Sequence, residues 1–355
     1  MLRGRRFGTA GSVAALLLTV GACTADPVTG PVPRELCAAG TLDAQGSSAQ
    51  RNAMEIWTRA YQRSCPGSTI NYEPSGSGAG IKALVAGTAD FAGSESLLEP
   101  KEQEQADAQC SGGRTISLPM VIGPVAVAYR LSGVAELRLT PATVARIFAG
   151  AISTWDDPAV RADNPGVDLP AAPIRSVHRS DDSGTTETFT TYLGAAAPGD
   201  WTLGTDRTWP GPGGTGAEGS ERLTEAVADT EGAIGYLELS YARRAGLPVA
   251  RIRNAAGEFV PPSAEGAGKA VTMPGNGLPV EVDSHTRVAG AYPIVLVTYE
   301  ILCERGLAPD EVPLVRGFLG WTASAEGQRA ITALGYAALP DVLRRRVADQ
   351  VAGIS

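Results

Sequence analysis

Short apolar runs alternate with helical patterns at the start of the chain. Three such runs, Leu36–Leu42, Thr69–Glu73 and Ala89–Gly93, have the length and the bounding turns of β-strands. Between them, apolar residues recur three and four positions apart, as on one face of an amphipathic helix. The alternation predicts βαβ units with a parallel sheet, and therefore an α/β fold.

Two longer apolar segments indicate two domains rather than one. Leu118–Leu131 is interrupted by proline and glycine, so it is typical of an extended segment rather than a helix. Ala291–Leu302 is continuously apolar. We interpret the first as the crossing into a second domain and the second as the return. A chain of 355 residues with 43% apolar content can form two cores.

The same alternation continues after the first crossing. Thr140 and Pro141 form a typical helix start, with Gly150 at the predicted end. Further strands are expected at Pro173–Val177 and Ala233–Tyr236. The other expectations are a long surface loop over Pro198–Ser220 and helices over Val312–Val347.

Three turns rich in serine, threonine and glycine stand at predicted helix starts. They are Gly46-Ser47-Ser48, Ser75-Gly76-Ser77-Gly78 and Arg179-Ser180-Asp181-Asp182-Ser183-Gly184-Thr185. The N–H groups of a helix's first turn lack partners, and the helix dipole places partial positive charge there. With hydroxyl donors and one guanidinium, the three turns predict a cradle for a small tetrahedral oxyanion. For the last of these turns taken alone, the alternative is an ordinary Ser/Thr helix cap with a surface arginine.

Composition and motifs narrow the class of ligand. The formal net charge of −8 argues against nonspecific binding of nucleic acid. None of the turns contains the Gly-Lys-[Ser/Thr] of a nucleotide P-loop, and none fits the Gly-x-Gly-x-x-Gly dinucleotide fingerprint. The ligand is therefore expected to be smaller than a nucleotide.

A carboxylate stands at the same predicted edge of the sheet. The segment Asp90-Phe91-Ala92-Gly93-Ser94-Glu95 ends the third strand, which places Glu95 where ligands of parallel sheets bind. The alternative is that Glu95 is a solvated loop residue.

The N-terminus has the pattern of a secretory signal. Three arginines precede an apolar run, Val13–Val20, which is too short for a membrane-spanning helix. Gly21, Ala22 and Cys23 follow and match a bacterial lipobox. We expect cleavage after residue 22, lipid attachment at Cys23, and a flexible tether rich in proline and glycine. Simple secretion, with Cys23 incidental, is the alternative.

Four further cysteines indicate two disulfides in an oxidising compartment. Three pairings are possible. Because Cys37 opens the first strand and Cys65 precedes the second, their positions favour Cys37–Cys65 if the strands are parallel neighbours. Cys110–Cys303 then remains. A zinc site is the alternative, but no Cys-x-x-Cys spacing is present and the chain has two histidines.

These segments together resemble the phosphate-binding lipoproteins of bacterial high-affinity phosphate ABC importers. The Arg179–Thr185 stretch is similar to the family's Arg-x-Asp-x-Ser-Gly-Thr signature, and Asp90–Glu95 to its Asp-Phe-Gly/Ala-x-Ser-Asp segment. Ser47 and Ser77 lie in segments that resemble the first and second binding loops. Leu139–Pro158 and Gly232–Tyr236 also match, and the likeness extends from about Thr41 to Tyr336.

The resemblance implies a periplasmic-binding-protein clamshell of two α/β lobes joined by a two-strand hinge. The expected divisions are a signal peptide (1–22), a tether (23–35), lobe I (36–122 and 291–355) and lobe II (123–290). The resemblance also implies phosphate contacts from Ser47, Ser48, Ala49, Ser77, Glu95, Arg179, Ser183, Gly184 and Thr185, with Asp181 orienting Arg179. The implied partners are inorganic phosphate, the permease and ATPase subunits of an ABC importer, and the cell membrane through the lipid. No cofactor, metal or nucleic acid is expected.

Two residues depart from the family pattern, and two other functions stay open. Ala49 replaces a frequent aromatic residue, and Glu95 replaces the usual aspartate. Another tetrahedral oxyanion, such as sulfate or molybdate, is one alternative ligand. An exported serine hydrolase is the other function, although the sequence lacks Gly-x-Ser-x-Gly and Ser-x-x-Lys motifs, and His178 is expected to pack at a strand end.

Overall fold

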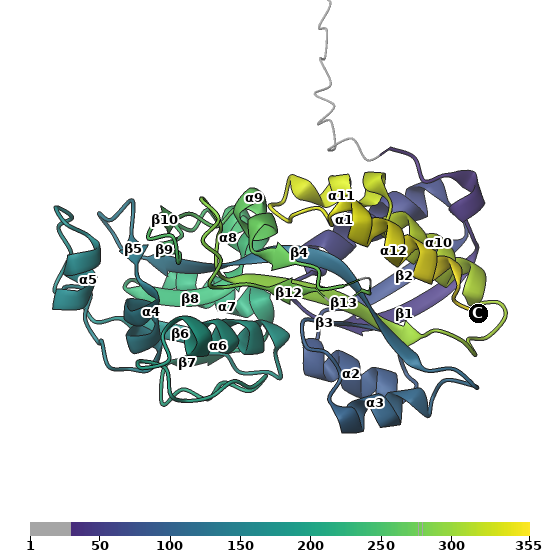
Figure 1. Cartoon of the computed structure of the whole chain (residues 1–355), viewed down its shortest axis with the longest axis horizontal. Coiled ribbons are helices and arrows are strands. Elements are labelled where there is room, and N and C mark those ends of the chain that lie inside the picture. Colours follow the sequence, from purple (N-terminus) through teal and green to yellow (C-terminus); the bar gives the residue numbers. More distant parts are fainter. Residues whose placement is uncertain (1–29, 276, 279) are drawn as a thin grey trace, which may run out of the picture.

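The structure is a computed structural model that describes residues 30–275, 277–278 and 280–355. The chain forms two α/β halves, with the long strands β4 (Thr115–Arg130) and β13 (Val295–Cys303) running between them (Figure 1). One eight-stranded sheet passes through both halves in the order β2-β1-β3-β13-β4-β8-β6-β7. This arrangement confirms the predicted α/β clamshell.

The first half contains the N-terminal βαβ units and the C-terminal helices. Its elements are β1 (Gly40–Gly46), α1 (Arg51–Ser64), β2 (Ser68–Glu73), α2 (Ser77–Val85), β3 (Phe91–Ser94), α3 (Pro100–Asp107), α10 (Val312–Thr322), α11 (Ala325–Thr332) and α12 (Asp341–Ala352). Strand β1 pairs in parallel with both β2 and β3, as predicted. The first strand begins at Gly40 rather than at Leu36, because Arg34–Leu36 form a short 3-10 helix.

The second half is built on three parallel strands. Its elements are β5 (Arg138–Leu139), α4 (Pro141–Phe148), α5 (Pro158–Asp163), β6 (Arg175–Arg179), α6 (Gly184–Ala196), β7 (Thr215–Ala217), α7 (Gly219–Asp229), β8 (Ala233–Glu238), α8 (Leu239–Ala245), β9 (Arg251–Arg253), β10 (Phe259–Val260), α9 (Ala264–Lys269), β11 (Val271–Thr272) and β12 (Glu281–Val282). Strand β6 pairs in parallel with β7 and β8. Thr140 caps α4, with Pro141 at its first position, as expected.

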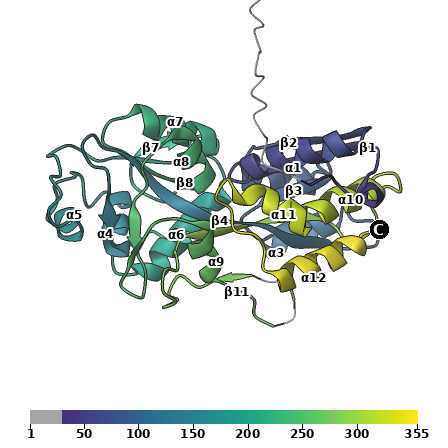
Figure 2. The same ribbon diagram turned by 90° about the horizontal axis from the view of Figure 1, so that it is seen from above.

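Strand β4 connects the two halves because its two ends pair with different partners. Residues up to Pro124 pair with β13, and Val125–Arg130 pair with β8. The backbone of β4 is therefore hydrogen-bonded to β13 over its first part and to β8, in the second half, over its last part. Figure 2 shows the halves on either side of this crossing.

The buried residues divide into a large cluster in each half and a small third one. Trp57, Phe318 and Trp321 belong to the first cluster, and Trp155 and Phe189 to the second. The clusters do not follow the expected boundary at residues 290 and 291. Tyr292, Ile294 and Leu296 contribute to the second cluster, while helix α9 packs on the first through Ala267 and Ala270. The lobe boundaries stay a prediction.

The predicted signal peptide and Cys23 lie outside the described residues, as does most of the expected tether. Within the expected tether, Val32 is buried in the first cluster and its N–H donates to Ser64 Oγ at 3.3 Å; the tether's bounds, residues 23–35, stay a prediction. The disulfides Cys37–Cys65 and Cys110–Cys303 are both present. In the part of the chain that is described, no helix has the length and apolar character needed to cross a membrane.

Candidate functional site

Three helices begin where parallel strands end, at the cleft between the halves. Helix α1 follows β1, α2 follows β2 and α6 follows β6. In the first half, Ser47 N–H donates to Gly93 O at 2.7 Å, which holds the first turn against the end of β3. In the second half, Tyr236 accepts from the N–H of Arg179 at 3.1 Å, which fixes the third turn. The first turns of α1, α2 and α6 therefore all lie at one edge of the sheet.

Glu95 is the centre of a set of hydroxyl donors. Ser77 Oγ donates to one carboxylate oxygen at 3.1 Å, and Thr298 Oγ1 donates to the other at 2.9 Å. Ser47 Oγ donates to that second oxygen as well. Burial raises the pKa of Glu95, although the three hydroxyls and the charge of Arg179 act to lower it. Glu95 is thus a proton-accepting group among donors and not a solvated loop residue.

Arg179 faces the same region from the second half. Its side chain is 2% exposed and forms a fork with Asp181, with Nε 2.6 Å from Oδ1 and Nη2 bonded to Oδ2. Gly219 N–H also donates to Asp181, at 3.0 Å. Burial alone would raise the pKa of Asp181, but these hydrogen bonds and the guanidinium charge hold it below its usual range. Asp181 therefore stays ionised beside the guanidinium of Arg179, and its role in aiming Arg179 at a ligand stays a prediction.

The start of helix α6 lies directly against Glu95. A Cβ atom placed on Gly184 would be 2.7 Å from both Glu95 Cβ and Ser77 Oγ. Ser183 caps the helix by accepting from Thr186 N–H at 3.2 Å, which leaves its hydroxyl proton available for donation. Thr185 is 1% exposed, and its Oγ1 has no hydrogen-bond partner in the described chain. Ser183 and Thr185 are thus the sequence neighbours, on either side, of the glycine that lies against Glu95.

Ser48 and Ala49 form hydrogen bonds with residues other than Glu95. Ser48 Oγ lies 2.9 Å from Ser220 Oγ and accepts from the N–H of Ser220 at 3.0 Å. The N–H of Ala49 donates to Ser47 Oγ at 3.2 Å, and its carbonyl accepts from Tyr336. The side chain of Ala49 belongs to the second apolar cluster. The contacts of these two residues with an anion stay predictions.

Polar contacts join the two halves around the site. Lys82 of α2 pairs with Asp182 at 3.1 Å, and Arg207 bonds Glu102 of α3 at 2.6 Å. The N–H of Gly78 donates to the carbonyl of Asp182 at 3.0 Å. These contacts hold the structure in a closed arrangement with the donors gathered between the halves.

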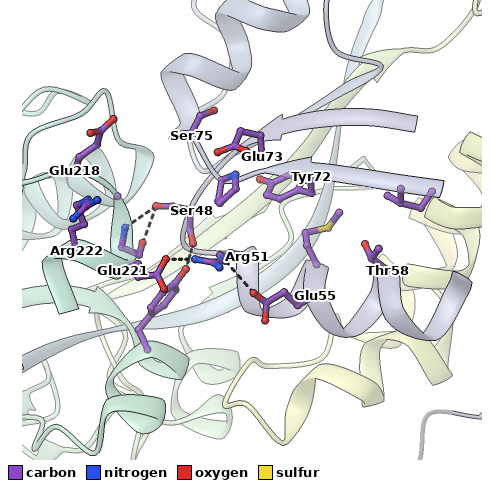
Figure 3. Close-up of a pocket in the computed structure, with 16 residues that line it drawn as sticks. Ser48, Arg51, Glu55, Thr58, Tyr72, Glu73, Ser75, Glu218, Glu221 and Arg222 are labelled. Atoms are coloured by element: carbon purple, nitrogen blue, oxygen red, sulfur yellow. Dashed lines mark hydrogen bonds and ion pairs between the residues drawn. The ribbon is translucent and has the colours of Figure 1, made fainter. Parts of the chain in front are cut away.

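A cleft of about 670 Å³ leads from the surface to Ser48 and Ser220 (Figure 3). Arg51 lies across it, paired with Glu55 on its own helix and with Glu221 from the other half. Arg179 reaches the inner end, where Nη1 donates to Ser220 Oγ at 3.4 Å. At its inner end the hydroxyl groups of Ser48 and Ser220 connect the two halves.

Sequence reasoning missed Thr298 and Ser220. Thr298 is one of two buried polar residues on the same face of the apolar strand β13, the other being Glu300. Alternate polar residues in such a run were the available signal. Ser220 follows Gly219 at the start of helix α7, directly after a short strand, so it repeats the pattern of the three recognised turns. It was hidden in the segment assigned to a surface loop.

The geometry gives no support to a serine nucleophile served by histidine. His178 lies in β6 with its ring stacked on Trp209, the centroids 5.1 Å apart, and its Nδ1 is 2.9 Å from the carbonyl of Arg179. It packs at the strand end, as expected.

Comparison with known proteins gives one family match and several close relatives. Residues 31–326 match the model of the PBP superfamily domain. The chain is 40% identical over 337 residues to the phosphate-binding protein PstS 3 of Mycobacterium leprae, covering 92% of this chain and 91% of that protein. It is 39% identical to the phosphate-binding protein PstS 2 of Mycobacterium tuberculosis, covering 88% and 87% of the two chains.

Solved structures share the fold at lower identity. A high-affinity periplasmic phosphate-binding protein bound with phosphate has a TM-score of 0.69 and 24% identity, with 87% of this chain and 93% of that one covered. A phosphate-binding protein from Stenotrophomonas maltophilia has a TM-score of 0.68 and 21% identity, with 88% and 94% covered.

Proposed function

The chain belongs to the PstS family of phosphate-binding proteins within the PBP superfamily, and on this premise we propose that it captures inorganic phosphate between its halves and delivers it to an ABC importer. It is a binding protein and not an enzyme. The proposed contacts are the hydroxyls of Ser47, Ser48, Ser77, Ser183 and Thr185, the backbone of Ala49 and Gly184, and the charged groups of Arg179 and Glu95.

The set of donors around a single carboxylate carries this proposal. Hydroxyls, helix N-termini and one guanidinium suit any small oxyanion. Glu95, in contrast, needs a proton to accept, and it currently accepts from Ser47, Ser77 and Thr298. Phosphate carries such a proton near neutral pH, whereas sulfate and molybdate do not. The site therefore favours phosphate over the alternative tetrahedral oxyanions.

Phosphate is expected to close the two halves around itself, because Ser77 and Glu95 belong to one half and Arg179 and Thr185 to the other. Binding energy from both halves then stabilises the closed state. Small-angle scattering of the purified protein should show a smaller radius of gyration with phosphate. An unchanged profile, starting from an open form, would contradict the closure and the capture that it serves.

Gly184→Ala tests the same closure from the structure. The added Cβ would lie 2.7 Å from Glu95 Cβ and Ser77 Oγ, so the closed contact cannot form without a shift. We expect phosphate affinity to fall by roughly 5-fold to 150-fold, from an overpacking cost of about 1–3 kcal/mol. Gly194→Ala, on the same helix, is the matched control, since its Cβ would meet Trp201 at an ordinary 3.8 Å. Equal affinity of the two variants would argue against Gly184 lying at the interface.

We further propose that a lipid at Cys23 anchors the protein outside the cytoplasmic membrane, where the permease and ATPase subunits of the importer receive its ligand. The support is the lipobox in the sequence. Cys23→Ser should move the protein from the membrane fraction of expressing cells to the soluble extracytoplasmic fraction. Thr24→Ser is the control and should stay with the membrane. A Cys23→Ser protein that remains membrane-bound would rule out this anchor.

A further inference from the structure

A second buried carboxyl lies behind the first binding turn. Glu300 is 1% exposed and stands on the same face of β13 as Thr298, two residues away. Thr298 contacts Glu95 directly. Glu300 instead faces Gln50, whose Nε2 lies 3.5 Å from Glu300 Oε2. This is a weak contact at the limit of hydrogen-bond length.

Gln50 links this carboxyl to the loop that holds Ser47. Its Nε2 donates to Tyr72 OH at 2.9 Å, and Tyr72 OH donates to the carbonyl of Ser47 at 2.9 Å. Gln50 is fully buried and precedes the first residue of helix α1. The path from Glu300 through Gln50 and Tyr72 therefore ends on the backbone of the turn whose serine contacts Glu95.

The backbone leaves room for this path at one glycine. A Cβ on Gly93 would lie 2.0 Å from Gln50 Nε2 and 2.5 Å from Tyr72 OH. Gly93 also accepts from the N–H of Ser47 at 2.7 Å and pairs with Glu300 across β3 and β13. The amide and the phenol thus pack directly on the strand that leads to Glu95.

The surroundings of Glu300 do not support a charge. The titratable groups that act on it are Tyr72 of β2 and Glu95, which follows β3, and neither is positive. The guanidinium of Arg51, on α1, is directed to Glu55 and Glu221 in the cleft, and the β4 residue paired with Glu300 is Leu118. Glu300 Oε1 has no partner among the described residues. A buried carboxylate with so little support takes up a proton.

We propose that Glu300 is a positioning residue of the phosphate site, and that it must be an uncharged carboxylic acid for the first turn to bind phosphate. This inference rests on the proposed function. An ionised Glu300 would place a second negative charge behind Glu95 and the anion, and it would draw Gln50 away from Tyr72. Burial raises the pKa of Glu300 to about 8, with the charge of Glu95 adding to the rise, so the ionisation falls just above neutral pH.

Glu300→Gln separates this effect from other ionisations. The amide has the same shape and no charge, while Glu95 and phosphate titrate as before. Phosphate dissociation constants should be measured by calorimetry for both proteins from pH 6.5 to pH 9.5. We expect the dissociation constant of the wild type divided by that of the variant to be nearly constant below pH 7.5. With a pKa of about 8, only about one-tenth of wild type is competent at pH 9, so the ratio should rise by about tenfold there.

Two further variants make the result decisive. Glu311→Gln is the control, because burial also raises the pKa of Glu311, but this carboxylate accepts from the N–H of Ala308 beside helix α10 and not from a residue of the three binding turns. For this control, the dissociation constant of the wild type divided by that of the variant should not change with pH. Tyr72→Phe removes the donor to the Ser47 carbonyl and should weaken phosphate binding by up to about tenfold at every pH.

The outcomes separate this inference from the proposed function. A ratio for Glu300→Gln that stays flat across the pH range would overturn the role of Glu300 while leaving phosphate binding established. An equal rise with Glu311→Gln would do the same. If Glu300→Gln does not fold, wild-type affinity in Tyr72→Phe would overturn the positioning path. Absence of phosphate binding by the wild type at pH 7 would overturn the function itself and this inference with it.

Discussion

Replacement of Arg179 by alanine is expected to weaken phosphate binding by about 2–5 kcal/mol, or roughly 30-fold to 5,000-fold in the dissociation constant. Arg179 is 2% exposed, and from the second half its charge acts on Glu95. The loss would exceed that of one contact, because Asp181 would then face the anion without its partner.

Two variants refine this result. Arg179→Lys should rescue only in part, since an ammonium group cannot reproduce the fork on Asp181. Arg175→Ala is the control, because Arg175 is exposed on the same strand β6. Calorimetry with phosphate measures all three. A loss below tenfold for Arg179→Ala, or an equal loss for Arg175→Ala, would count against Arg179 as a ligand.

Glu95→Gln is expected to lose discrimination between anions more than affinity for phosphate. In the proposed site of the wild type, the carboxylate would accept the proton of phosphate, whereas sulfate would bring two negative charges together in a buried site. The glutamine amide can donate to a deprotonated oxygen, which removes this penalty. Such a mismatch costs about 3 kcal/mol or more, so the phosphate-to-sulfate preference should fall by about a hundredfold or more.

Competition binding of phosphate against sulfate in the two proteins measures this change. Glu104→Gln, an exposed position on helix α3, controls for the altered net charge. If Glu95→Gln rejects sulfate as well as the wild type does, Glu95 does not read the proton. The raised pKa of Glu95 adds a condition: at low pH it is protonated, so the preference of the wild type should weaken as pH falls through that value.

Local sequence signals were sufficient to predict which residues of each turn stand at the start of a helix. Ser47, Ser77 and Ser183 stand where a strand ends and a helix starts, so periodicity and capping patterns reveal them without knowledge of the fold. The disulfide Cys37–Cys65 could be inferred in the same way, since both residues lie beside strands that the pattern makes parallel neighbours.

Contacts between distant segments could not be predicted in this way. Thr298 reaches Glu95 across 203 positions of sequence, and the apolar run that contains it indicates only a buried strand. The pairing of Ser48 with Ser220 depends on how the two halves close. Sequence alone also could not show how the site accommodates glutamate in place of the usual aspartate at position 95. The space for Glu95 depends on the absence of a Cβ atom at Gly184.

The central claim is that one protonated oxyanion is held between the two halves. Calorimetry of the purified wild-type protein at pH 7 against phosphate, sulfate and molybdate tests it most directly. The account predicts one-to-one binding of phosphate, with sulfate and molybdate weaker by about a hundredfold or more. No binding of phosphate, or sulfate bound as tightly as phosphate, would contradict it.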